Sequence, residues 1–190
     1  RGIIPRFRGV HQTGGGSVIA ASIEAMYAQP EKVYDLAGID QFDLRYNNFD
    51  ELITSIYWHL YFSMICTNEM VDRIGGSPLD NQSVQYTGSS DDAALNDAVA
   101  RYQMPPSARQ YLRRNYDPTG RLRLPVLTLH NTRDPLVPAG VQDAYRDLVA
   151  SNGCSEWLRQ EFVDRQDHIF TGEETVQAIL ELVAWAEEAD

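Results

Sequence analysis

The chain has 190 residues, of which 43% are apolar, and it carries a formal net charge of −11 with a single lysine, Lys32. This length and apolar content suit a folded domain with its own core and exclude a disordered chain. The acidic balance argues against a long nucleic-acid interface, because phosphate binding needs clustered cations. No stretch approaches the roughly 20 apolar residues of a membrane span, so we expect a soluble protein.

The first part of the chain is predicted to be helical. Residues 1–16 are rich in glycine and indicate a loop, after which Ser17 would cap a helix over 18–29 that ends at Pro30. A second loop is expected as far as Asn48. The clearest helical pattern in the chain follows it, with apolar residues at Phe49, Leu52, Ile53, Ile56, Tyr57, Leu60 and Met64.

A polar loop and two shorter helices come next. Residues 75–92 are rich in Gly, Ser, Asp and Asn, which is typical of a surface loop. Ser89, with Asp92 three residues later, resembles a capping box that opens a helix over 91–103. Another helix is expected over 107–116.

The pattern changes from helix to strand at Asp117-Pro118-Thr119-Gly120, which is a turn signal. We therefore predict two regions, a mainly helical one over 1–117 and a βαβα unit over 118–190.

The second region contains two strand, turn and helix units. Residues 125–129 form a short apolar run bounded by prolines, typical of a strand buried on both faces of a parallel sheet, and Asp134 lies in the turn after it. An amphipathic helix is predicted over 141–149. The second strand, over 157–163, leads to a turn that holds His168. The last helix carries an apolar stripe made of Val176, Ile179, Leu180 and Val183.

Two parallel strands alone do not make a stable sheet, because parallel sheets are covered on both faces and normally have several strands. The fold class is therefore α/β, with a parallel sheet that is incomplete within this sequence. We expect a partner chain, or an upstream segment of a longer protein, to complete it.

A buried strand that ends in an Asp turn, a helix, and a strand that ends in His resemble the carboxyl-terminal part of the α/β-hydrolase superfamily. In that fold the catalytic triad runs Ser, Asp, His along the chain. Asp134 and His168 match the positions of the acid and the base. The resemblance implies that the helical block before them is a lid.

The resemblance implies a serine hydrolase that acts on esters, or less readily on amides and peptides. His168 would be the general base for the serine hydroxyl, and Asp134 would orient the imidazole. The aromatic residues of the lid imply a small-molecule ester substrate with a bulky apolar group.

The sequence departs from the family pattern at two points. The nucleophile turn Gly-x-Ser-x-Gly is absent from these 190 residues; the nearest text, Gly15-Gly16-Ser17, lacks the second glycine. In addition, Asp167 precedes His168 where members often have Gly, and its carboxylate would screen the imidazole. We therefore expect the chain to be inactive without the part that bears the nucleophile.

Other interpretations of the same residues remain open. Asp134 could simply form a turn before Pro135, and His168 could be a surface residue that caps the next helix. At the level of function, the alternative is a non-catalytic binding or assembly subunit derived from a hydrolase. No grouping of His, Cys and carboxylates has metal-ligand spacing, so neither a metal nor another cofactor is expected.

Overall fold

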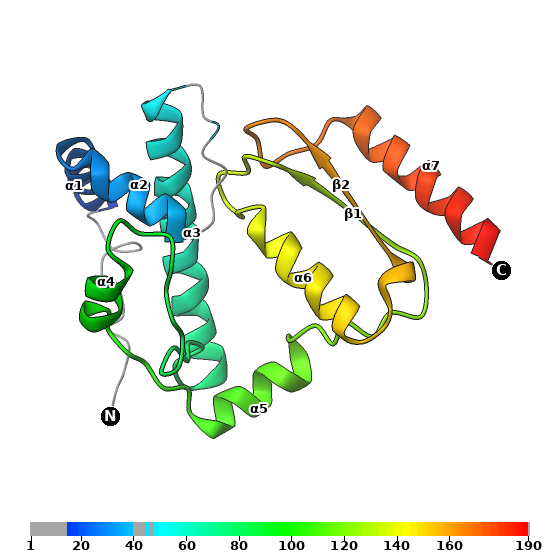
Figure 1. Ribbon diagram of the computed structural model, residues 1–190, viewed down its shortest axis with the longest axis horizontal. Helices are drawn as coiled ribbons and strands as arrows, with labels where there is room; N and C mark the ends of the chain where they lie inside the picture. The colour runs from blue at the N-terminus through cyan, green and yellow to red at the C-terminus, as the bar shows by residue number, and fades with distance from the viewer. Residues whose placement is uncertain (1–14, 40–44, 46–47, 190) are drawn as a thin grey trace. The chain divides into compact units, whose positions relative to one another are not determined.

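The computed structural model describes residues 15–39, 45 and 48–189 (Figure 1). Their contacts divide these residues into two compact units. The helical unit comprises residues 15–39 and 48–118, and the α/β unit comprises Arg45 and residues 119–189. The protein is thus a mixed α/β chain in which helix predominates over strand.

The helical unit contains α1 (Gly15–Ala28), α2 (Pro30–Ile39), α3 (Phe49–Ile74), α4 (Asp92–Ala98) and α5 (Pro106–Asn115). Its buried apolar side chains form the core and belong mainly to α2, α3 and α5: Val33, Ala37, Leu52, Ile53, Ile56, Ile74, Ala108 and Leu112.

Helix α3, predicted from its apolar spacing, is capped at both ends. At its start, Oδ1 of Asn48 accepts a hydrogen bond of 3.0 Å from the N–H of Glu51. At its end, Gly75 adopts a left-handed backbone with φ of 73° and donates to the carbonyl of Val71. The apolar stripe between these caps buries Leu52 and Ile56.

The prediction of a loop after Pro30 is wrong, because Pro30–Ile39 forms α2. Proline is well suited to the first position of a helix, where its missing N–H has no partner to lose. The helix then buries Val33 and Ala37, which are 2% and 0% exposed. Tertiary packing therefore stabilises a segment that looked like a loop.

Helix α4 is shorter than the predicted 91–103, and its cap differs from the prediction. Asp91, not Ser89, accepts the capping hydrogen bond, from the N–H of Ala94. Past the end of α4 the backbone is extended, and Tyr102 donates its N–H to the side chain of Asn81. This pairing with a distant residue competes with further helix.

The α/β unit follows the order β1 (Val126–Asn131), α6 (Gly140–Ser151), a single 3-10 turn η1 (Ser155–Trp157), β2 (Leu158–Val163) and α7 (Gly172–Ala189). Among the described residues, the sheet consists of β1 and β2 alone, paired in parallel from Val126 opposite Leu158 to Asn131 opposite Val163.

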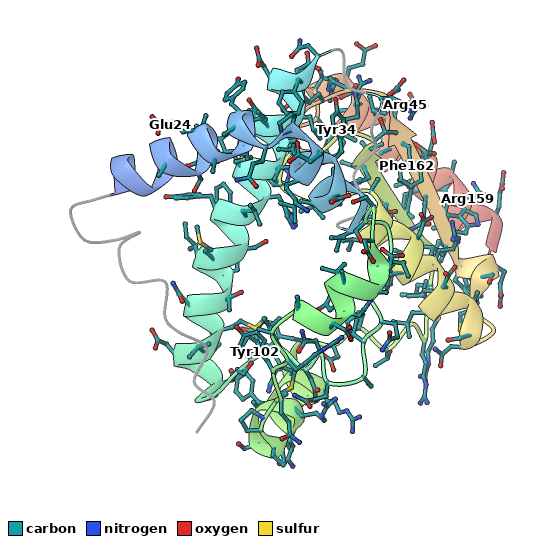
Figure 2. The ribbon with its side chains drawn as sticks, turned by 60° about the vertical axis from the view of Figure 1, so that its left-hand side comes forward. Glu24, Tyr34, Arg45, Tyr102, Arg159 and Phe162 are labelled. Carbon is teal, nitrogen blue, oxygen red and sulfur yellow. The ribbon has the colours of Figure 1, made fainter. Side chains whose placement is uncertain are left out.

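The two helices of this unit cover opposite faces of the sheet (Figure 1). Successive side chains of a strand point to opposite faces. On β2, Gln160 donates to the carbonyl of Gln142 in α6, whereas the guanidinium of Arg159, labelled in Figure 2, lies 4.1 Å from the ring centre of Trp185 in α7.

Two apolar surfaces of the α/β unit are less buried than the sequence suggested. Strand β1 was expected to be buried on both faces, but its residues from Val126 to Leu129 are only half-buried. The apolar stripe of α7 faces away from the sheet, with 48–59% of each residue exposed at Val176, Ile179, Leu180 and Val183. Among the described residues, no strand pairs with the second edge of β1, and the stripe of α7 stays uncovered.

Candidate active site

Asp134 is buried in the turn that follows β1. Its side chain is 3% exposed, and its Oδ1 accepts hydrogen bonds from the N–H groups of Leu136, at 2.7 Å, and Val137, at 3.0 Å. His130 supports the same turn, since its Nε2 lies 3.0 Å from the carbonyl oxygen of Val137. Asp134 therefore forms the expected turn with one oxygen and keeps the other available.

His168 lies in the loop between β2 and α7, which we call the His168 loop and define as residues 164–171. Its Nδ1 lies 2.8 Å from Oδ2 of Asp134. The two turns meet because β1 and β2 are parallel neighbours that end level with each other, at Asn131 and Val163. The structure thus brings together the two residues singled out by the sequence.

The exposure of the two partners differs. The side chain of His168 is 48% exposed, whereas that of Asp134 is 3% exposed. Because Nδ1 faces the carboxylate, the second ring nitrogen, Nε2, is the one that can exchange a proton with another group. The interpretation of His168 as a helix cap is wrong, because Thr171 accepts the hydrogen bond from the N–H of Glu174 in the first turn of α7.

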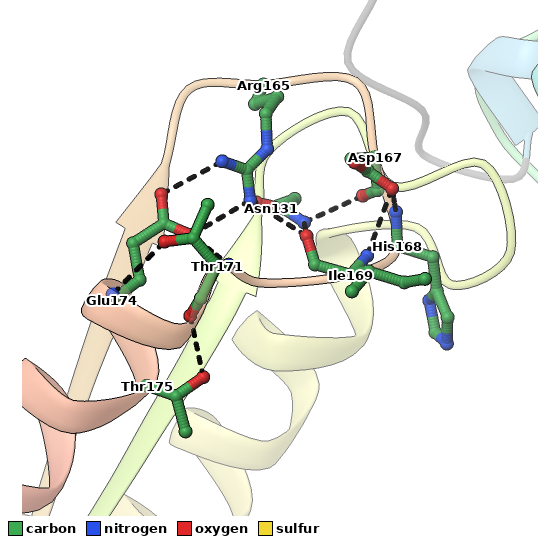
Figure 3. Close-up of polar contacts among 8 residues, drawn as sticks. All are labelled: Asn131, Arg165, Asp167, His168, Ile169, Thr171, Glu174 and Thr175. Carbon is green, nitrogen blue, oxygen red and sulfur yellow. Dashed lines mark hydrogen bonds and ion pairs between the residues drawn. The ribbon is translucent and has the colours of Figure 1, made fainter.

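The carboxylate of Asp167 binds the backbone of its own loop. Its Oδ1 accepts hydrogen bonds from the backbone N–H groups of His168, at 2.7 Å, and Ile169, at 3.1 Å (Figure 3). These two bonds lower the pKa of the Asp167 carboxyl. The residue therefore shapes the backbone of the His168 loop, a role that the sequence did not suggest.

An ion pair joins the His168 loop to α7. Arg165 donates to both carboxylate oxygens of Glu174, at 2.9 and 3.1 Å, and also to the carbonyl of Ile169, at 2.8 Å (Figure 3). Arg165 and the N–H of Thr171 lower the pKa of the Glu174 carboxyl to about 2. The spacing of Thr171 and Glu174 is that of a capping box, a signal that the sequence contained and that our prediction missed.

Asn131, the last residue of β1, also contacts the His168 loop. Its side chain is 0% exposed, and its Nδ2 donates to the carbonyl of Asp167 at 2.8 Å. No local sequence pattern predicts this contact of Asn131, because its partner lies 36 positions away.

The segment 1–14 and the side chain of Ser17 lie outside what the structure describes. Within the described part of the chain, no group of three or more His, Cys, Asp and Glu side chains could hold a metal ion. No described helix has the length and apolar character needed to cross a membrane.

Chemically, a buried carboxylate against one nitrogen of a half-exposed imidazole is suited to accept a proton at the other nitrogen and to stabilise the cation that forms. In comparisons with known proteins, no protein-family model, curated protein or solved structure matches the chain. The functional argument therefore rests on the chain's own residues.

Proposed function

We propose that this chain supplies the acid and the base of a Ser-His-Asp triad in a serine hydrolase of the α/β-hydrolase type. The observation that carries the proposal is the 2.8 Å contact between Nδ1 of His168 and Oδ2 of Asp134. In this role Asp134 holds the imidazole in the correct tautomer, and Nε2 of His168 accepts the proton of a serine hydroxyl. The serine belongs to a partner chain or to an upstream segment.

The burial of Asp134 supports an acid and base role over a surface ion pair. An exposed ion pair contributes little to stability because water screens it. Asp134 is instead shielded from water, and the N–H groups of Leu136 and Val137 stabilise its charge. A carboxylate fixed in this way beside an accessible imidazole is suited to proton transfer at Nε2.

The open surfaces of the α/β unit support a larger sheet. Strand β1 pairs with β2 on one side, and no other described strand pairs with it. A parallel sheet this small is unusual, because such sheets are normally built from several strands covered on both faces. We propose that further strands extend the sheet from the free edge of β1 and that the nucleophile follows one of them.

The proposed reaction is hydrolysis of an ester, and less readily of an amide, through an acyl-enzyme. That the substrate carries a bulky apolar group is proposed from the aromatic content of the helical unit alone. The rings of Trp58 and Phe62 lie 5.9 Å apart, with the two residues 40% and 39% exposed. Exposed aromatic side chains of this kind are suited to an apolar ligand.

A serine-reactive phosphonate tests the proposal on the native protein together with any polypeptide that accompanies it. We expect one serine, within a Gly-x-Ser-x-Gly turn of the accompanying polypeptide or an upstream segment, to be labelled. His168→Ala should abolish labelling, whereas His59→Ala in α3 should leave it unchanged.

The alternative is a hydrolase-derived assembly subunit without catalysis, which the exposed apolar stripe of α7 favours. Absence of labelling on every polypeptide, in a preparation whose partner is present, would support this alternative. Labelling that survives His168→Ala would also contradict the triad.

A further inference from the structure

The His168 loop has little regular backbone pairing. Its backbone contacts with the rest of the unit include the N–H of Arg133, which donates to the carbonyl of Arg165, and the N–H of Arg165, which donates to Val163. Nearer to His168, the loop backbone is bound by side chains instead. The amide of Asn131 donates to the carbonyl of Asp167, and the guanidinium of Arg165 donates to the carbonyl of Ile169 (Figure 3). The backbone carbonyls of Asp167 and Ile169, the residues on either side of His168, are thus held by side chains.

Asn131 contacts both turns of the candidate site. Its backbone carbonyl accepts the N–H of Asp134 at 3.3 Å, and its side chain donates to the carbonyl of Asp167 at 2.8 Å. One residue therefore fixes the turn that carries the carboxylate and the loop that carries the imidazole. Its complete burial means that the amide cannot exchange this partner for water.

Arg165 extends the network to α7. Its Nη2 lies 3.3 Å from Oδ1 of Asn131, so the amide is engaged at both ends. Glu174 holds the guanidinium with both carboxylate oxygens and is itself fixed by the N–H of Thr171 at 2.8 Å. The planar, bidentate pair leaves the guanidinium one orientation, which presents Nη2 to Ile169 and Asn131.

We propose that Asn131, supported by the Arg165 and Glu174 pair, is a positioning residue that holds the backbone around His168 so that Nδ1 stays on Asp134. The hydrogen bond made by Nδ1 sets which ring nitrogen carries the proton. Asn131 thus acts on the tautomer of His168 without touching the ring. The catalytic purpose of this arrangement rests on the proposed function.

The tautomer can be measured on the full chain without any turnover. Long-range proton and nitrogen NMR on protein labelled with ¹⁵N-histidine distinguishes Nδ1–H from Nε2–H in a neutral ring, and the same nitrogen shifts identify a ring that is protonated at both positions. The chain has four histidines, and His168→Gln assigns the signal. In the wild type we expect Nδ1–H at His168.

Asn131→Asp keeps the shape of the side chain but removes the N–H donor. We expect the ratio of Nδ1–H to Nε2–H at His168 to fall about five-fold, the change that corresponds to loss of one ordinary hydrogen bond. Asn152→Asp is the matched control, because it makes the same change in charge at an amide that donates to Thr119 and Leu148, away from the loop. It should leave the ratio unchanged.

Glu174→Gln is the second variant and carries the test if Asn131→Asp does not fold. It should lower the same ratio, whereas Glu173→Gln, with the same charge change in the same helical turn, should not. An unchanged ratio in the folded variants overturns the positioning role.

The outcome is separable from that of the proposed function. A wild-type His168 without the Nδ1–H tautomer contradicts the contact with Asp134 and so the triad itself. A wild-type Nδ1–H tautomer that survives Asn131→Asp and Glu174→Gln contradicts only the positioning role.

Discussion

Nδ1 of His168 lies 2.8 Å from Oδ2 of Asp134, although the two residues are 34 positions apart. The contact exists because two parallel strands end level with each other and each passes directly into a turn that holds a titratable side chain. Asp134 is the more constrained partner, since its other oxygen already accepts two backbone N–H groups.

Asp134→Asn should reduce catalysis while preserving the turn. The amide oxygen can still accept from Leu136 and Val137, but the amide nitrogen then faces His168 and disfavours the Nδ1–H tautomer. We expect phosphonate labelling of the associated serine to slow by about 10⁴-fold, as when a triad carboxylate is replaced. Asp143→Asn, an exposed carboxylate of α6 that pairs with Arg146 outside both turns of the site, should label at the wild-type rate. Equal labelling rates for the two variants would show that Asp134 does not take part in the proposed mechanism.

The ion pair between Arg165 and Glu174 should make stability depend on pH in the acid range. Arg165 lowers the pKa of the Glu174 carboxyl to about 2, from an ordinary value of 4.5. The folded state therefore binds this proton less readily than the unfolded state. The resulting stabilisation is fully present above about pH 5 and is lost as the pH falls toward 2.

Urea unfolding of wild type and Glu174→Gln across this range measures the effect. The difference in free energy of unfolding between the two should shrink as the pH falls from about 5 to about 2. Glu173→Gln should show a smaller dependence. A difference that stays constant with pH would mean that the ion pair is not formed in solution.

Gly120 and Gly153 provide a matched test of packing in the α/β unit. Both have left-handed backbones, with φ of 67° and 68°, so alanine at either position is strained by about 1–2 kcal/mol. A Cβ at Gly120 would also lie 2.8 Å from the carbonyl oxygen of Leu148, whereas one at Gly153 would meet nothing within 4 Å.

Gly120→Ala should therefore lower the free energy of unfolding by about 1–3 kcal/mol more than Gly153→Ala, because overpacking adds to the backbone strain. Chemical denaturation of the two variants gives the comparison directly. Equal losses would show that residue 120 does not approach Leu148 so closely.

The exposed stripe of α7 should matter for assembly rather than for folding. Leu180 is 59% exposed, so Leu180→Lys should change the free energy of unfolding by less than about 0.5 kcal/mol. If the stripe is covered in the complete hydrolase, the same change should reduce the amount of phosphonate-labelled polypeptide that co-elutes with this chain. Gln177→Lys, on the polar flank of the same helix, serves as the control. If the labelled polypeptide co-elutes equally well with the Leu180→Lys variant, the stripe of α7 is not part of the interface between them.

The sequence by itself determined the elements with local signals. The apolar spacing of α3 and the strand, turn and helix order after Leu124 needed no tertiary information, because periodicity and turn residues act within a few positions. The same local reasoning, together with the resemblance to the α/β-hydrolases, selected Asp134 and His168, since each lies in the turn after a predicted strand. The roles proposed for them stay predictions.

Only the tertiary structure decided the features that depend on distant partners. Pro30–Ile39 is helical because Val33 and Ala37 are buried, and α4 stops early because Tyr102 pairs with Asn81. The role of Asn131 depends on a carbonyl 36 positions away. Hydrogen bonds and burial between remote segments arise only when the chain folds back on itself, and no short window of sequence encodes them.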